Sequence, residues 1–522
     1  MQMKLVFAIL MIVITICGAV HRAWAEPVCS TARLMQIPDV QITSNTSETA
    51  PAPHCKVTGV IGTEIGFELL LPNDWNGKFI MGGSGGFAGN FANAAHDLWN
   101  VVESGWATVA TDTGHKGNAV SASWALNNLE RQVNFGHTAV HRTAVTAKAI
   151  IKGFYGRPSS RDLFLGCSRG GGQALMVAQK SPDLFDAIYA GAPAYSWTTE
   201  MAGRWTKNAQ FMYPDPANIT SPVIDTDALT LIGNAVMKQC DAIDGLKDGI
   251  LNDPRQCRFN ITSLACSAGS SNQCLTPEQV AAAQAIYGDF KIGGKMSRGT
   301  PVGAELPGNP LGWGRWITGG YVPSAEVEFH PGMEDDGFKA PAIPNARWGF
   351  ATELMKYFFY GDPNWTYKDY GFSDFAHHAA RLAPTLNAEN PDLSKFRANG
   401  GKLIIDNGWM DASLSAYGTL DYYKGVLAFD KAARDDVRLF LRPGVTHCLG
   451  GPGPDGTNYI TALEAWLDTG VAPEQLDAPF VNTMTRKPTG GGRIICAYPN
   501  VVTYDGSGDP NAPASFSCKI PK

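Results

Sequence analysis

The sequence predicts an α/β protein built on a mainly parallel sheet, with one large inserted segment. Short apolar strand patterns alternate with helical patterns up to about residue 194, and again after about residue 390. Between residues 195 and 390 the alternation stops, and the chain becomes rich in Trp, Tyr, Pro and Gly. Regular alternation is typical of parallel strands covered by helices. We therefore expect a sheet domain at residues 26–194 and 391–522, and a lid domain at 195–390.

Length and composition indicate a folded globular protein. The chain has 522 residues, enough for one large domain with an insertion or for two to three domains. Hydrophobic residues make up 44% of the chain and charged residues 17%, which is typical of a chain that buries a core. The formal net charge of -6 gives no reason to expect nucleic acid or an anionic membrane as partner. The sequence does not indicate an oligomeric state.

The first residues have the pattern of a signal peptide. Lys4 supplies a positive start, residues 5–16 are almost all apolar, and Ala-Trp-Ala at 23–25 offers a cleavage site. The apolar stretch is too short and wrongly flanked for a transmembrane helix, and no other stretch could span a bilayer. We therefore expect residues 1–25 to be removed and the product to be secreted or periplasmic.

The first half of the sheet domain supplies its elements in order. Residues 59–71 predict early antiparallel strands, and residues 78–81 predict a short strand that runs into a glycine-rich loop at 82–86. Residues 106–111 predict another strand. An Ala/Val/Ile face at 139–154 predicts a helix.

A Gly-x-Ser-x-Gly motif follows that helix. The apolar run at 163–165 predicts a buried strand, Gly-Cys-Ser-Arg-Gly occupies 166–170, and residues 173–180 predict a helix. A serine in such a strand–turn–helix is typical of the nucleophile elbow of α/β-hydrolases. The sequence therefore predicts the α/β-hydrolase fold, with Ser168 as nucleophile.

The remaining strands of the sheet domain lie on both sides of the lid domain. Residues 185–194 predict a strand before the lid domain, and residues 402–406 and 437–441 predict strands after it. Residues 459–467 predict the helix that closes the fold.

The loops after the late strands supply a candidate acid and base. A nucleophilic serine needs a base within hydrogen-bond reach, and the base needs an acid that holds its tautomer. His447 follows the last predicted strand, and Asp411 follows the strand before it. The order Ser, Asp, His is the order in α/β-hydrolases. His115 precedes the serine, breaks that order and is interpreted as a structural residue.

The cysteines suggest how serine and histidine are brought together. Ten cysteines remain after the signal peptide, and an even count in an exported protein favours disulfides, although spacing does not fix their pairing. Near neighbours suggest four local pairs and leave two cysteines for each other: Cys29–Cys55, Cys240–Cys257, Cys266–Cys274, Cys496–Cys518 and Cys167–Cys448. The last pair would place Ser168 beside His447. The alternative is two buried free thiols and an ordinary histidine.

Backbone amides supply a candidate oxyanion hole. In α/β-hydrolases one donor is the amide after the nucleophile, here Arg169, and the other comes from an early loop. Gly85 or Gly86 would be that second donor; a flexible turn is the alternative. Leu414, three residues after Asp411, is a candidate for the wall of the substrate pocket.

These motifs together resemble the tannase and feruloyl esterase family, which is marked by a Cys-Ser, a distant Asp and a His-Cys. The resemblance covers nearly all of the mature chain and implies an esterase with Ser168, Asp411 and His447 as its triad and with the five disulfides above. Further matching segments are Trp-Asn-Gly-Lys-Phe at 75–79, Thr-Asp-Thr-Gly-His at 111–115 and Asp-Tyr-Tyr at 421–423. The chain departs from the family at Arg169 and Gly172, where many relatives have a small or polar residue and an arginine. This departure puts the substrate preference in doubt.

A second matching motif lies in the lid domain, at residues 240–250. Its closely spaced carboxylates repel one another unless a cation lies among them, and Ca²⁺ prefers such oxygen ligands. The resemblance implies a structural Ca²⁺ as cofactor, held by these five residues: Asp241, Asp244, Leu246, Asp248 and Ile250. Leu246 and Ile250 would contribute backbone carbonyls. The alternative is a solvated acidic turn.

The resemblance implies a serine esterase for small esters of aromatic acids, such as feruloyl, galloyl or related hydroxycinnamoyl and hydroxybenzoyl esters. Three alternatives stay open. The enzyme could hydrolyse synthetic aromatic monoesters such as mono(2-hydroxyethyl) terephthalate. It could be a serine peptidase or acyltransferase, because the fold does not fix the chemistry. It could also be a non-catalytic binding protein.

Overall fold

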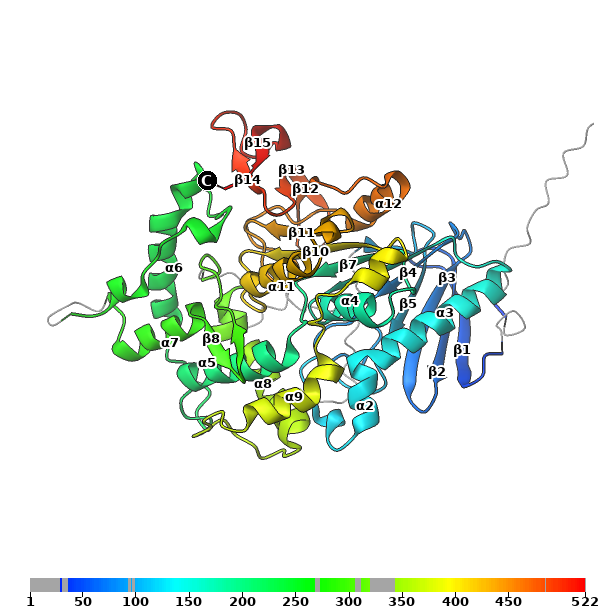
Figure 1. Cartoon of the computed structure of the whole chain (residues 1–522), viewed down its shortest axis with the longest axis horizontal. Coiled ribbons are helices and arrows are strands. Elements are labelled where there is room, and N and C mark those ends of the chain that lie inside the picture. The colour runs from blue at the N-terminus through cyan, green and yellow to red at the C-terminus, as the bar shows by residue number, and fades with distance from the viewer. Residues whose placement is uncertain are drawn as a thin grey trace, which may run out of the picture.

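A nine-stranded sheet runs through the molecule, and helices cover it (Figure 1). The computed structural model does not describe every residue, and the predicted signal peptide lies outside the described part. The described residues are 29–30, 36–92, 95, 99–267, 273–305, 311–319, 343–483 and 485–521.

The sheet is antiparallel at its first edge and parallel through the rest. Its strands stand in the order β1-β2-β3-β5-β4-β6-β7-β10-β11. The pairs from β1 to β5 are antiparallel, and every pair from β5 to β11 is parallel. The strands are β1 (Val40–Glu48), β2 (His54–Ile61), β3 (Ile65–Pro72), β4 (Lys78–Gly82), β5 (Ala107–Thr111), β6 (Arg161–Cys167), β7 (Ala187–Gly191), β10 (Lys402–Gly408) and β11 (Val437–Arg442). Parallel strands present their carboxyl ends at one edge, so the loops after β4, β6, β10 and β11 meet there.

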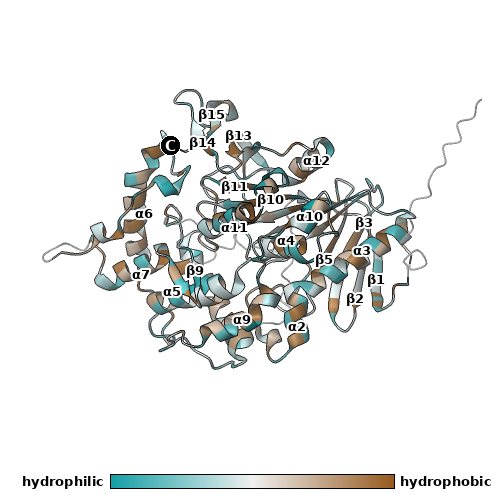
Figure 2. Ribbon diagram, viewed as in Figure 1, coloured by the Kyte–Doolittle hydropathy of each residue, from teal (hydrophilic) through white to brown (hydrophobic). Residues whose placement is uncertain are grey.

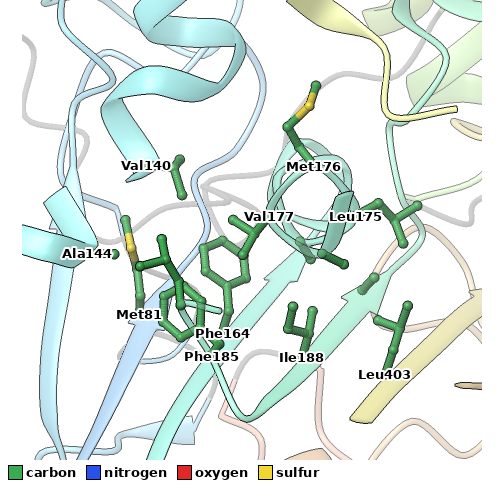
Figure 3. Close-up of a cluster of buried hydrophobic side chains, with 14 of the residues drawn as sticks. Met81, Val140, Ala144, Phe164, Leu175, Met176, Val177, Phe185, Ile188 and Leu403 are labelled. Carbon is green, nitrogen blue, oxygen red and sulfur yellow. The ribbon is translucent and has the colours of Figure 1, made fainter. Parts of the chain in front are cut away.

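The main core lies between this sheet and its helices. Figure 3 shows Phe164, Val177 and Phe185 meeting beneath α4, and Figure 2 shows hydrophobic and hydrophilic residues alternating along α3. Burial of apolar side chains on one side of each helix fixes the helices to the sheet. The helices of this part are α2 (Leu129–Val133), α3 (Ala139–Tyr155), α4 (Arg169–Lys180), α10 (Ser394–Ala398), α11 (Ala416–Phe429) and α12 (Tyr459–Thr469).

Residues 195–390 are called the lid segment below, and its described residues form mainly helices, drawn green to yellow in Figure 1. The expected lack of regular strand–helix alternation agrees with this, since only two short strands occur among its described residues. Its elements are η4 (Trp197–Arg204), α5 (Trp205–Met212), α6 (Thr226–Cys240), η5 (Asp241–Asp244), η6 (Pro254–Gln256), η7 (Ile261–Leu264), α7 (Pro277–Tyr287), β8 (Phe290–Ile292), β9 (Lys295–Ser297), η8 (Gly314–Thr318), α8 (Ala346–Leu354), η9 (Met355–Tyr360) and α9 (Phe375–Leu386).

Two short hairpins follow α12. β12 pairs with β13 and β14 with β15, all antiparallel. Their bounds are β12 (Gln475–Val481), β13 (Pro488–Cys496), β14 (Val501–Tyr504) and β15 (Phe516–Lys519). In the part of the chain that the structure describes, no helix is long and apolar enough to cross a membrane.

Helix α4 begins earlier than the sequence pattern predicts, at Arg169 instead of Gln173. Glycine is a poor helix former, so propensity disfavours helix over the run Gly170–Gly172. Packing explains the difference, because a Cβ at Gly171 would lie 2.2 Å from the carbonyl oxygen of Gly191, at the end of β7. The glycines let the helix lie against the neighbouring strand, and this tertiary contact outweighs their low propensity.

Candidate active site

The loop from β6 to α4 forms a sharp elbow at Ser168. Ser168 has φ 60° and ψ -122°, a sparsely populated conformation for a residue with a Cβ. Its amide donates to the carbonyl of Gly191 at 3.0 Å, and its carbonyl accepts from Ala194 at 2.9 Å. A Cβ at Gly166 would lie 2.3 Å from the backbone of Gly170, so only glycine permits this close turn. The elbow that the sequence predicts is therefore present, with the serine at its apex.

The candidate acid and base lie together at the same edge of the sheet. Oδ2 of Asp411 lies 2.9 Å from Nδ1 of His447. Asp411 is fully buried, and its Oδ1 accepts the amides of Ser413 at 2.7 Å and Leu414 at 2.9 Å. Nε2 of His447 is buried and has no hydrogen-bond partner among the described residues. With the proton on Nδ1 donated to Asp411, Nε2 is an acceptor for a hydroxyl proton.

A disulfide joins the serine loop to the histidine loop. The Cα atoms of Cys167 and Cys448 lie 5.9 Å apart, so the residues next to them, Ser168 and His447, are neighbours in space. The structure also forms the other four expected disulfides: Cys29–Cys55, Cys240–Cys257, Cys266–Cys274 and Cys496–Cys518. The loops that carry Ser168 and His447 are thus linked covalently.

The histidine loop has a second attachment, to the sheet. Arg442, at the end of β11, donates from Nη2 to the carbonyl of Cys448 at 3.0 Å. Its Nε lies 2.8 Å from Oδ2 of Asp406 on β10, and both side chains are buried. The buried pair of Arg442 and Asp406 thus holds the backbone directly after His447.

The glycine-rich loop after β4 lies against the elbow. The amide of Gly83 donates to Leu165 at 2.8 Å, and the amide of Ser84 donates to Oε1 of Gln173 on α4 at 3.0 Å. A Cβ at Gly85 would meet nothing within 4 Å, so this residue faces open space. Gly86 has φ +52°, and a Cβ there would lie 2.2 Å from the carbonyl oxygen of Ala119. Gly85 and Gly86 both stay candidates for the second oxyanion donor.

The side chain of Arg169 is buried next to the elbow. Its Nη2 donates to the carbonyls of Phe135 and, at 3.2 Å, of Gly136. The guanidinium lies 4.2 Å from the Phe135 ring centroid, and burial lowers the pKa of Arg169 to about 9. The side chain at which this chain departs from the family pattern is thus occupied in packing.

The lid segment contributes one of the aromatic side chains that the sequence offers for a pocket surface but does not distinguish from ordinary core. Trp316, in η8, packs edge-on against His447, with ring centroids 4.8 Å apart and planes at 74°. Leu414 is 2% exposed and belongs to the same apolar cluster as Trp316 and Phe87. Apolar side chains thus lie next to the candidate base and acid. An aromatic residue in a lid is a weak sequence signal, since most such residues are ordinary core.

His115 does not join the catalytic constellation. It stacks on Trp124 with ring centroids 3.6 Å apart, and its Nε2 lies 2.9 Å from the carbonyl of Phe87. Burial lowers the pKa of His115 to about 3, so the ring is neutral. These contacts agree with the structural interpretation made from its place before the serine.

The acidic loop of the lid segment holds its carboxylates with backbone amides. Oδ1 of Asp241 accepts from Gly249 at 2.9 Å, the carboxylate of Asp244 accepts from Leu246 and Asn252 at 3.1 Å each, and Oδ1 of Asp248 accepts from Ile250 at 3.1 Å. Arg493 pairs with the other oxygen of Asp248. Burial, together with Asp248 and Asp241 nearby, raises the pKa of Asp244 to about 6.

The carboxylate oxygens of this loop are the type of ligand that a hard cation prefers, but their arrangement does not by itself form a metal site. Ionised carboxylates keep lone pairs after accepting one or two amides, so they could still bind Ca²⁺. Across the described ranges, however, no three His, Cys, Asp or Glu side chains gather closely enough to hold a metal ion.

Comparison with known proteins places these features in context. The profile of the family described as "Tannase and feruloyl esterase" matches residues 52–519. Mono(2-hydroxyethyl) terephthalate hydrolase from Piscinibacter sakaiensis is 31% identical, covering 96% of this chain and 88% of that protein. A probable feruloyl esterase B from Emericella nidulans is 28% identical, covering 91% of this chain and 88% of that protein.

A solved structure agrees with the sequence comparison. The crystal structure of feruloyl esterase B from Aspergillus oryzae superposes with a TM-score of 0.80 at 25% identity, covering 95% of this chain and 99% of that one. With the mostly parallel sheet, this similarity confirms the predicted α/β-hydrolase fold.

Proposed function

This chain belongs to the tannase and feruloyl esterase family and is a carboxylic ester hydrolase, and we propose that it cleaves esters of aromatic carboxylic acids with Ser168, His447 and Asp411 as its triad. The contact that carries the proposal is the 2.9 Å approach of Asp411 to Nδ1 of His447, which leaves a buried, unpartnered Nε2. The disulfide next to both Ser168 and His447 supports it, because it holds base and nucleophile in one neighbourhood.

In the acylation step, Nε2 of His447 takes the proton of the Ser168 hydroxyl as the oxygen attacks the ester carbonyl. The amides of Arg169 and of Gly85 or Gly86 stabilise the oxyanion that forms, and each such donor contributes about 10²–10³ in rate. The imidazolium, held by Asp411, then gives its proton to the alcohol oxygen as the carbon–oxygen bond breaks. The alcohol leaves, and the acyl group remains on Ser168.

In the deacylation step, His447 takes a proton from water as the water oxygen attacks the acyl carbonyl. The same amides stabilise the second oxyanion. The proton returns from His447 to Oγ of Ser168 as the acyl–serine bond breaks, which frees the aromatic acid. The apolar side chains of Trp316 and Leu414 suit an aromatic acyl group.

A serine-directed phosphonate and a substrate panel test this proposal. We expect the phosphonate to label Ser168, and the purified enzyme to hydrolyse methyl ferulate or methyl gallate. Absence of the adduct would favour a binding protein, and turnover of peptide amides alone would favour a peptidase.

A second substrate class is suggested by one relative. The 31% identical protein is named for hydrolysis of mono(2-hydroxyethyl) terephthalate, an aromatic monoester. Including this compound in the panel separates a natural-ester preference from a monoester preference by the ratio of kcat/KM values.

We also propose that Asp241, Asp244 and Asp248, with the carbonyls of Leu246 and Ile250, hold a structural Ca²⁺. The oxygen-rich donor set and the raised pKa of Asp244 support this. Bound Ca²⁺ would neutralise these half-buried carboxylates and brace the lid segment. It takes no part in the steps above.

We further propose that the enzyme is exported to the periplasm or the medium. Five disulfides support this, since disulfides persist in oxidising compartments. Mass spectrometry of the protein recovered from a native host would show whether its chain begins near Glu26.

A further inference from the structure

The orientation of the Asp411 carboxylate is set by the backbone that follows it. Residues 411–415, called the acid loop here, connect β10 to α11. Oδ1 of Asp411 accepts the amides of Ser413 and Leu414, which turns Oδ2 toward His447. Any group that fixes the backbone of this loop therefore also fixes the hydrogen bond between acid and base.

Side chains of the lid segment hold this backbone. Nε of Arg347, on α8, donates to the carbonyl of Ser413 at 3.1 Å. Oε1 of Glu200, on η4, accepts the amide of Ser415 at 3.0 Å. The hydroxyl of Ser415 donates to the carbonyl of Gly299 at 2.5 Å. Three separate parts of the lid segment thus contact the acid loop, on both sides of Leu414.

Arg347 is itself held firmly in place. It is 2% exposed, its Nη1 donates to Asn208 at 3.2 Å, and its Nη2 donates to Thr300 at 2.9 Å. Burial, together with the like charge of Arg204, lowers the pKa of Arg347 to about 9, and the opposite charges of Glu200 and Asp411 partly offset this shift. A buried guanidinium is costly unless it is hydrogen-bonded, and the bonds to Ser413, Asn208 and Thr300 offset part of that cost.

We propose that Arg347, assisted by Glu200, is a positioning residue for Asp411. The lid segment therefore stays in contact with the acid loop at all times and helps to hold the triad in place. The role of Asp411 rests on the proposed function; the contacts with the acid loop do not. A lid that lifted away as a rigid cover would break the bonds to Ser413 and Ser415 and release the acid. Substrate must therefore enter without separation of η4 and α8 from the acid loop.

Kinetics of Arg347→Met tests the proposal. Methionine keeps much of the length of the side chain and removes every donor. We expect kcat to fall about 10–100-fold while KM changes less than about twofold, because orientation of the acid–base pair is lost and the substrate pocket is not. Arg347→Lys, which restores one donor and the charge, should recover part of kcat.

Arg204→Met is the matched control. Arg204 is also a buried arginine of the lid segment, but it donates to the carbonyls of Ile286, Gly288 and Ser297 and not to the acid loop. We expect its kcat to stay within about twofold of wild type, even where its thermal stability falls. An equal loss of kcat in both variants would overturn the proposal, as would a rise in KM alone for Arg347→Met.

Hydrogen exchange provides a readout that needs no activity. The amides of Ser413 and Leu414 should exchange at least about tenfold faster in Arg347→Met than in wild type or Arg204→Met. Unchanged exchange of these amides in Arg347→Met would overturn the proposal, whether or not the wild-type enzyme hydrolyses aromatic esters. Failure of the wild-type enzyme to hydrolyse any aromatic ester would by itself reject only the proposed function. If Arg347→Met does not fold, Ser415→Ala replaces it as the test, because this variant removes one hydrogen bond between the acid loop and the lid segment. A kcat about threefold lower than that of wild type supports the proposal, and a wild-type kcat contradicts it.

Discussion

Cys167 and Cys448 form a disulfide although 281 residues separate them, and each lies directly beside a member of the proposed triad. Replacing both with alanine should lower kcat/KM at least about tenfold, because the serine and histidine loops are then free to separate. The disulfide Cys266–Cys274 closes a span of only 8 residues and serves as control. Loop-closure entropy predicts that the long bridge stabilises by about 3 kcal/mol more than the short one. Denaturant unfolding of both double variants checks this, and equal losses would contradict it.

Ser168→Ala should abolish hydrolysis and leave the fold intact. Loss of a triad serine lowers kcat by up to about 10⁶-fold, and the remainder comes from the oxyanion hole and binding. Progress curves on methyl ferulate and labelling with the phosphonate measure both effects. Ser181→Ala, just after α4, is the control and should keep activity and labelling. Wild-type turnover in Ser168→Ala would remove Ser168 from the mechanism.

Leu414→Ala should raise KM for aromatic esters by about 5–50-fold and change kcat little. The bond from residue 414 to Asp411 comes from its backbone amide, so truncating the side chain leaves the acid oriented. Because Leu414 is buried, the variant should also lose about 2–5 kcal/mol of stability. Michaelis–Menten kinetics at a temperature where the variant is folded checks the first effect. An unchanged KM would show that Leu414 does not line the pocket.

Removal of calcium should lower the melting temperature by several degrees. A ligand that binds only the folded state stabilises it by about 2.7 kcal/mol at 100 times its Kd. Thermal unfolding in EDTA, in Ca²⁺ and in Mg²⁺ measures the effect, with Mg²⁺ as the control for ionic charge. Asp241→Asn combined with Asp248→Asn should remove the difference between EDTA and Ca²⁺. If EDTA leaves the wild-type melting temperature unchanged, the calcium proposal fails.

Stability should decline as pH rises through about 7, because of Glu305 in the lid segment. Burial raises the pKa of Glu305 from 4.5 to about 7, although the hydroxyl of Tyr287 donates to it at 2.7 Å. A carboxyl whose pKa is raised on folding contributes stability that is full below pH 4.5 and is lost above about pH 7. The loss should be on the order of 3 kcal/mol.

Glu305→Gln isolates this effect, since glutamine resembles the neutral acid at every pH. The free energy of unfolding of the variant, followed from pH 5 to pH 8.5 in denaturant, should fall less steeply than that of wild type. Parallel curves would show that Glu305 ionises normally in the folded protein.

Much of the proposed catalytic centre could be predicted from the sequence because its signals are local. A strand, a Gly-x-Ser-x-Gly turn and a helix are adjacent in the chain, so their pattern places Ser168 at an elbow. Asp411 and His447 follow strands whose parallel order brings their ends to one edge of the sheet. The early start of α4 at Arg169 escaped prediction because helix propensity says nothing of the strand end on which the glycines pack.

The sequence by itself determined the elbow, the order of acid and base, and the chemistry of the loops that carry them, since each depends on neighbouring residues or on strand periodicity. Only the tertiary structure decided that Trp316 packs on His447, that Arg347 and Glu200 hold the acid loop, and that the Arg169 side chain is buried. These contacts join segments that lie far apart in the chain. Periodicity shows which face of an element is buried, but the partner of that face is chosen by packing in three dimensions.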